Sequence, residues 1–251
     1  MAIKITELLI KITIIVLVLM FVIILLIKRF IYFRPSHTFL PVQENYKDII
    51  HGHLHGWLLE NQSNNKIILY CHGNTGNMSY CDNKISSLKQ LGYNVLIFDY
   101  SGFGKSSGVP SEQQLYDDAS MITALVRQTY STEQIILYGE SLGATIAIYV
   151  AIRYKIPLVI LESPLPSMRI IAEKILGRAK FLAFPFIEFN IENYLKGYHG
   201  KSLLIHSIND EKIPYETIVN LQNLVTLHIP VTGLHDSIII PWNEIKRFIE
   251  S

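Results

Sequence analysis

The feature that most constrains the fold of this chain is the segment Gly-Glu-Ser-Leu-Gly at residues 139–143. The apolar run at 134–138 has the length of a strand, and residues 144–151 have the composition of a helix. A serine held in the sharp turn between a strand and a helix adopts a sparsely populated backbone conformation, and side chains in place of the two glycines would collide with the strand or the helix. We therefore predict that Ser141 is an exposed nucleophile. A plain tight turn is the alternative.

Two later loops carry the residues that activate a serine. A strand is predicted at 201–207, and Asp210 lies in the polar loop just past its end. Another strand is predicted at 226–231, and His235 lies in the loop that follows it. Open α/β sheets build their sites beyond the strand ends, so these side chains are expected to converge on Ser141. His235 would take the serine proton, and Asp210 would fix the imidazole tautomer.

Other residues compete for the role of the acid and the base. Glu211 and Glu162 are alternatives to Asp210 as the orienting carboxylate, and a loop rich in acids is commonly just solvated. His206 and His228 fall within predicted strands, which favours packing or capping over catalysis.

A glycine-rich loop supplies a candidate oxyanion hole. It occupies residues 72–77 and follows a strand predicted at 66–71. The backbone amides of Asn74 and Leu142 are the expected oxyanion donors. The loop lacks the glycine and lysine spacing of a phosphate-binding loop. Residues 99–106 lack that spacing too, and we interpret them as a structural turn beside the site.

These segments together resemble the α/β-hydrolase superfamily, over about residues 40 to 250. The matching residues are His72-Gly73-Asn74, the segment 99–104, the segment 139–143, Asp210, Ile213-Pro214 and His235. Within the superfamily the chain resembles the small membrane-anchored acyl hydrolases, a depalmitoylase-like subgroup with a similar His-Gly-Asn-x-Gly-Asn loop and an N-terminal anchor. The resemblance implies hydrolysis of an ester, thioester or amide, with some members removing acyl groups from proteins.

The order of predicted elements agrees with this fold. Strands and helices alternate from about residue 55, which predicts a mostly parallel sheet with helices on both faces. Strands are expected near 54–59, 66–71, 94–99, 134–139, 157–162, 201–207 and 226–231, and helices near 79–91, 112–130, 142–154 and 241–250.

The segment from 163 to 200 is expected to form a short cap over the site. It contains Phe181, Phe184, Phe186 and Phe189 with little charge between them. These aromatic side chains either pack a helix on the sheet or line an acyl pocket, and some of them could dip toward a bilayer.

The N-terminus predicts a membrane anchor. Residues 12–27 contain no charge, and an extension back to Leu8 adds only Lys11. About 20 apolar residues in a helix match the hydrocarbon thickness, so a transmembrane helix is predicted at about 8–27. A signal peptide is disfavoured because the run ends in a basic and aromatic segment rather than a cleavage site. We expect an anchor at 1–34, a short linker marked by Pro35 and Pro41, and one α/β-hydrolase domain at 35–251.

The charges that flank the predicted span slightly favour a cytoplasmic catalytic domain on a single-pass membrane protein.

The net charge of +1 gives no support for nucleic-acid binding. Two cysteines, Cys71 and Cys81, form no disulfide framework or zinc pattern. Three imidazoles at 51, 53 and 55 would share one face of a continuous strand, yet serine chemistry needs no metal, so we expect no metal and no cofactor.

The sequence therefore predicts a membrane-anchored serine hydrolase acting through an acyl-enzyme on an ester or thioester, with membrane-borne acyl substrates among the candidates. A catalytically silent scaffold is disfavoured because every catalytic position is filled. A peptidase or acyltransferase on the same triad stays open, because fold and triad are shared and the pocket decides the substrate.

Overall fold

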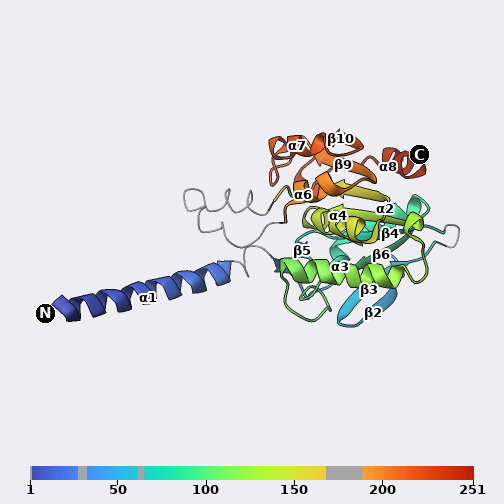
Figure 1. The fold of residues 1–251 in the computed structure, drawn as a ribbon. Coiled ribbons are helices and arrows are strands. Elements are labelled where there is room, and N and C mark those ends of the chain that lie inside the picture. Colours follow the sequence, from blue (N-terminus) through green and yellow to red (C-terminus); the bar gives the residue numbers. More distant parts are fainter. Residues whose placement is uncertain (1, 28–32, 62–64, 168–188) are drawn as a thin grey trace.

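The computed structural model describes residues 2–27, 33–61, 65–167 and 189–251, with side chains of the first helix given for residues 6–22. Its centre is an eight-stranded sheet in the order β10-β9-β8-β7-β4-β6-β3-β2 (Figure 1). The strands are β2 (Lys47–His51), β3 (Leu54–Leu59), β4 (Ile67–Cys71), β6 (Asn94–Phe98), β7 (Ile135–Glu140), β8 (Leu158–Glu162), β9 (Lys201–Ser207) and β10 (Leu227–Val231). All neighbours pair in parallel except β2 with β3 and β3 with β6.

The predicted strands are confirmed. β4, β6 and β8 are buried along their whole length, β7 is buried except at its last residue, Glu140, and all four consist mainly of apolar residues. The sequence analysis missed β2, an antiparallel edge strand whose residues are exposed or half-buried. It also missed a separate two-stranded pair, β1 (Arg34–Pro35) with β5 (Thr75–Gly76), which is too short to leave a pattern.

Helices cover both faces of the sheet. They are α2 (Asp82–Gln90), α3 (Glu112–Val126), α4 (Leu142–Tyr154), α6 (Ile191–Gly197), α7 (Val219–Gln222) and α8 (Trp242–Glu250). Short 3-10 turns occur at η2 (Met78–Cys81), η3 (Thr132–Gln134), η5 (Tyr215–Ile218) and η6 (His235–Ser237). One apolar core joins the sheet to α3, α4 and α6, and a second core on the other face joins it to α2 and α8 (Figure 1).

The N-terminal helix α1 runs from Ala2 to Ile27. Large apolar side chains from Leu8 to Val22 are exposed along it. Within the described part of the chain, no helix meets the combined length and hydropathy that a membrane span requires. The structure therefore does not support the transmembrane helix expected at 8–27.

Residues 33–40 pack on the domain, although a linker was expected to begin at Pro35. Phe33 is buried, and its ring meets the buried ring of Phe189 edge-on at 6.3 Å. The Asn77 side chain donates to the carbonyls of Ser36 and Thr38 at 3.0 and 2.9 Å. Of the four phenylalanines expected in the cap, Phe189 packs in the core, and Phe181, Phe184 and Phe186 lie outside the described residues.

The three histidines near residue 53 do not share a strand face. β2 ends at His51, the chain turns at Gly52 with φ of +62°, and β3 begins at Leu54. His53 pairs with Asp118 at 3.1 Å, whereas the His55 imidazole pairs with Asp48 at 2.7 Å. Within the described ranges, no group of three or more histidine, cysteine, aspartate or glutamate side chains is placed to hold a metal ion.

Two glycines in helices predict opposite effects of an added methyl group. A Cβ at Gly143 would lie 2.0 Å from the Cys71 carbonyl oxygen, whereas one at Gly197 would meet nothing within 4 Å. We expect Gly143→Ala to lower the free energy of unfolding by about 1–3 kcal/mol or more through overpacking. Gly197→Ala should raise it by about 0.4–1 kcal/mol. Urea unfolding of both variants checks this, and equal stability of the two would contradict the close approach at Gly143.

Candidate active site

Ser141 occupies the turn between β7 and α4, as predicted. It has φ of +53° and ψ of −114°, which is unusual for a residue with a side chain. The two glycines have the predicted function: a Cβ at Gly139 would lie 2.4 Å from the Gly143 carbonyl oxygen, and one at Gly143 would strike the end of β4. The turn is therefore possible only because both positions lack side chains.

The oxyanion loop expected after β4 lies against this turn. A Cβ at Gly73 would sit 3.6 Å from the Cβ of Ser141, which is ordinary contact distance. Leu142 is the first residue of α4, where backbone N–H groups have no partner within the helix. Asn74 lies in the loop, and its carbonyl accepts a hydrogen bond from the Arg34 N–H at 3.1 Å. Both expected oxyanion residues thus come from segments that flank Ser141.

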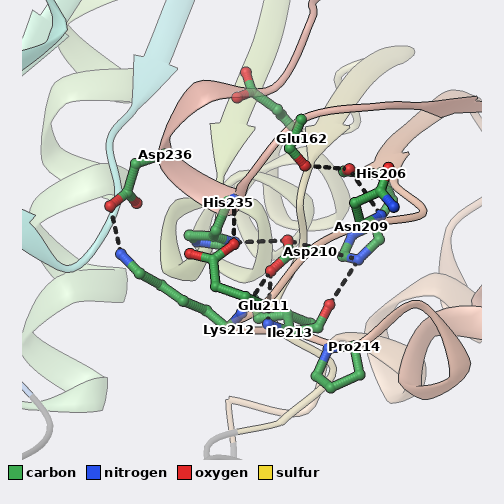
Figure 2. A network of polar contacts seen from close by, with 12 residues as sticks. Glu162, His206, Asn209, Asp210, Glu211, Lys212, Ile213, Pro214, His235 and Asp236 are labelled. Carbon is green, nitrogen blue, oxygen red and sulfur yellow. Dashed lines mark hydrogen bonds and ion pairs between the residues drawn. The ribbon is translucent and has the colours of Figure 1, made fainter.

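The structure brings Asp210 and His235 together (Figure 2). Asp210 Oδ2 lies 2.7 Å from His235 Nδ1, while Oδ1 accepts from the N–H groups of Lys212 at 2.9 Å and Ile213 at 2.7 Å. Burial would raise the pKa of Asp210, but the hydrogen bonds from His235 and the Ile213 N–H outweigh it, so the pKa lies below its ordinary value. The ionised carboxylate requires a hydrogen on Nδ1, which leaves Nε2 of the neutral ring as the proton acceptor.

This pair and the serine turn lie at one edge of the sheet. β7, β8, β9 and β10 pair in parallel, so the turn after β7 and the loops after β9 and β10 all follow the carboxyl ends of their strands. Ser141, Asp210 and His235 therefore reach the same edge of the sheet.

The competing acids bind elsewhere. The Glu211 carboxylate accepts the backbone N–H of His235 at 2.8 Å, and Asp236 forms an ion pair with Lys212 (Figure 2). Glu162 accepts from the Lys84 ammonium at 2.7 Å and the Tyr138 hydroxyl at 2.5 Å. Among the described residues, Asp210 is therefore the carboxylate that meets the His235 ring.

His206 contacts the loop that carries Asp210. Its Nε2–H donates to the Ile213 carbonyl at 2.9 Å, and its ring lies 3.7 Å from Asp210 (Figure 2). Burial lowers the pKa of His206, so the ring stays neutral around neutral pH. The half-buried ring of His228 packs near Tyr215. Both histidines thus have the packing roles that their strand positions indicated.

A buried acid and a buried imidazole meet beneath the oxyanion loop. His72 Nε2 lies 3.5 Å from Asp99 Oδ1, and the Met78 N–H donates to the same oxygen at 2.7 Å. Burial lowers the pKa of His72 to about 4. Burial also raises the pKa of Asp99 to about 7, against the opposing effect of the Met78 hydrogen bond. Near pH 6 the pair is therefore uncharged, with the proton on Asp99.

This arrangement predicts a pH-dependent effect of Asp99→Asn. Asp99 ionises near pH 4 in the unfolded chain but stays protonated up to about pH 7 in the folded wild type. Its protonated carboxyl therefore stabilises the folded state fully below about pH 4, and this stabilisation is lost as the pH rises to about 7. Asparagine stays neutral, so stability of the variant relative to wild type should increase by about 2–3 kcal/mol between pH 5 and pH 8. Urea unfolding at both pH values measures the difference. A constant difference would show that burial does not raise the Asp99 pKa.

The chain matches a hydrolase family model and several individual proteins in sequence. Residues 62–201, more than half of the 251 residues, match the Hydrolase_4 family, described as serine aminopeptidase S33. The protein R595 of Acanthamoeba polyphaga mimivirus is 32% identical, with 67% of this chain and 64% of that protein covered. Human alpha/beta hydrolase domain-containing protein 17C is 36% identical over 59% of this chain and 45% of its own length. The chain thus spans about half to two thirds of these relatives.

Solved structures share the fold. An esterase of Pyrococcus furiosus, Pf2001, superposes with a TM-score of 0.70 at 20% identity, covering 86% of this chain and 98% of its own. Est1E of Butyrivibrio proteoclasticus, solved with ferulic acid, gives a TM-score of 0.60 at 20% identity, covering 78% and 92%. The resemblance expected from the sequence is confirmed: this chain has the α/β-hydrolase fold and belongs to the Hydrolase_4 family.

Proposed function

We propose that the protein is a serine hydrolase that cleaves a carboxylic ester or thioester through an acyl-enzyme. The observation that carries this proposal is the joint placement of Ser141 at positive φ in a strand–helix turn and of the Asp210–His235 pair near the same edge. A serine, an orienting acid and a base, here after β7, β9 and β10, form the catalytic unit of this fold.

Acylation begins with proton transfer from the Ser141 hydroxyl to Nε2 of His235. The serine oxygen bonds to the carbonyl carbon, and the Asp210 carboxylate stabilises the imidazolium through Nδ1–H. Negative charge develops on the carbonyl oxygen, where the backbone amides of Asn74 and Leu142 donate. Their flanking positions in the structure support this assignment.

The tetrahedral intermediate then collapses. The bond to the leaving alcohol or thiol breaks, and His235 gives its proton to the departing oxygen or sulfur. Water enters, loses a proton to His235 and attacks the acyl carbon. The bond between the acyl carbon and the Ser141 oxygen then breaks, His235 returns the proton to that oxygen, and the carboxylic acid leaves. The side chains proposed for the reaction are thus returned to their starting state.

A peptidase is the second candidate, because the matching family is described as serine aminopeptidase. The same triad serves amides, so the leaving group that the pocket accepts decides between them. Matched ester, thioester and aminoacyl-amide substrates with one common acyl group separate the two candidates by their kcat/KM values.

The triad predicts covalent labelling by a fluorophosphonate probe. The detergent-solubilised full chain should be labelled, and Ser141→Ala should abolish labelling because the phosphorus bonds to the serine oxygen. Asp210→Asn should lower kcat for an ester by about 10⁴, since the imidazole loses its tautomer. The matched control is Asp117→Asn, an exposed acid of α3 whose carboxylate accepts from Gln113, which should keep wild-type turnover. Unlabelled folded protein would favour the silent scaffold.

We propose separately that α1 attaches the protein to lipid. Apolar side chains are exposed at residues 8–10, 12 and 14–22, and burial in the apolar layer of a membrane would remove them from water. This attachment requires that the side chains enter the lipid, not that the helix crosses it.

Vesicle flotation tests the attachment. The full chain should float with phosphatidylcholine vesicles, and Ile15→Asp combined with Leu19→Asp should weaken flotation because two charges enter the apolar stretch. Ile50→Asp, a similar change at an exposed isoleucine of β2, is the control and should float like wild type. Wild-type protein that stays at the bottom of the gradient would refute lipid attachment.

A further inference from the structure

A partly buried ionic cluster lies on the face of the sheet that α2 covers, and the proposed mechanism does not use it. The Lys84 ammonium donates to Glu140 Oε2 and to Glu162 Oε1, each at 2.7 Å. The hydroxyls of Tyr70 and Tyr138 donate to the same two carboxylates, Tyr70 to Glu140 and Tyr138 to Glu162. Lys84 and Glu140 are 18% and 25% exposed, and Glu162 is 2% exposed.

The two carboxylates belong to the residues that hold the nucleophile. Glu140 is the residue before Ser141, and it is paired in register with Glu162 across β7 and β8. The Glu162 carbonyl accepts the backbone N–H of Ser141 at 2.9 Å. Lys84 therefore bridges Glu140, which precedes Ser141 in the chain, and Glu162, whose carbonyl accepts the Ser141 N–H.

Among the residues that the structure describes, Lys84 is the cation on which the cluster depends. Burial by itself lowers the pKa of Lys84, but the two carboxylates outweigh burial and raise it above its ordinary value, so the ammonium stays charged. Burial raises the pKa of Glu162, although Lys84 opposes this. Without the ammonium, two neighbouring carboxylates with little solvent access would repel each other, and one would take up a proton or turn away.

We propose that Lys84 is a positioning residue for the reaction, because it fixes the Glu140 and Glu162 side chains and thereby holds Ser141 in its attacking conformation. The inference rests on the proposed serine hydrolysis. A residue at positive φ costs about 1–3 kcal/mol and persists only where its surroundings fix it. Lys84 supplies one of those constraints without touching substrate.

Four variants of the full chain test this role. Lys84→Met removes the charge and keeps much of the side-chain length, and Lys84→Arg restores a cation. Lys89→Met is the matched control, because Lys89 lies on the same helix and pairs with Glu44 at 3.0 Å near the surface. The double variant Lys84→Met with Glu140→Gln removes the ammonium together with the carboxylate beside Ser141.

Turnover of a chromogenic ester is the first measurement, normalised to the sites titrated by a fluorophosphonate. We expect Lys84→Met to lower kcat about 10- to 100-fold with KM within about twofold, since a misplaced nucleophile costs rates of this order. Lys84→Arg and the double variant should each recover at least half of the loss on a logarithmic scale. Lys89→Met should match wild type. Wild-type kcat in Lys84→Met, or a loss that neither variant recovers, would overturn the proposal.

Hydrogen exchange at the Ser141 amide is the second measurement and needs no activity. The N–H bonded to the Glu162 carbonyl should exchange at least tenfold faster in Lys84→Met than in Lys89→Met, while the amide of Val159 in β8 exchanges equally in both. If wild type shows no Ser141-dependent labelling, the proposed hydrolysis fails, and this exchange still tests whether Lys84 orders the turn. Equal exchange at Ser141 in both variants would refute that ordering.

Discussion

The geometry of the site depends on the close packing of the serine turn against the end of β4. Ser141 has φ of +53°, a conformation that costs free energy for any residue with a side chain. The turn is held because Gly143 brings the start of α4 against the Cys71 carbonyl, with no space for even one added carbon atom. The same packing places the oxyanion loop beside the nucleophile, since that loop begins at the residue after Cys71. One backbone contact therefore sets both the strained turn and the position of the donors expected to stabilise the oxyanion.

The loops that carry the acid and the base are fixed differently, by polar contacts between exposed segments. Asp210 contacts the His235 ring, Glu211 accepts the His235 backbone N–H, and Lys212 pairs with Asp236. Three consecutive residues of one loop thus bind the other loop, and each contact restricts the imidazole that the first contact orients. Glu211, which competed with Asp210 in the sequence, therefore assists it indirectly. Exposed ion pairs contribute little stability on their own. Their value here lies in reducing the freedom of the base before the reaction.

Local patterns predicted most of the fold and the candidate triad, but not the contacts made across the chain. The strands of the parallel sheet are apolar runs with clear ends, and the Gly-x-Ser-x-Gly segment has a steric requirement that the sequence displays directly. In contrast, the contacts of Lys84 with Glu140 and Glu162 join residues separated by 56 and 78 positions, and nothing in the helix around Lys84 indicates a buried ammonium. The histidines at 51–55 were predicted to share a face only under the assumption of a continuous strand. The positive φ of Gly52 breaks that assumption.

The segment that begins at Phe33 links the N-terminal helix to the site more closely than a linker would. Arg34 donates its backbone N–H to the carbonyl of Asn74, so the chain meets the oxyanion loop immediately after Phe33 enters the core. Between residue 27 and residue 33 the chain can span at most about 22 Å. Lipid attached to α1 would therefore lie within a few tens of ångströms of the nucleophile. An acyl chain held in that lipid would have a short path to Ser141, whereas a site on the opposite edge of the sheet would require extraction into water. The proposed attachment and the proposed hydrolysis thus support the same class of substrate, a membrane-borne acyl ester or thioester.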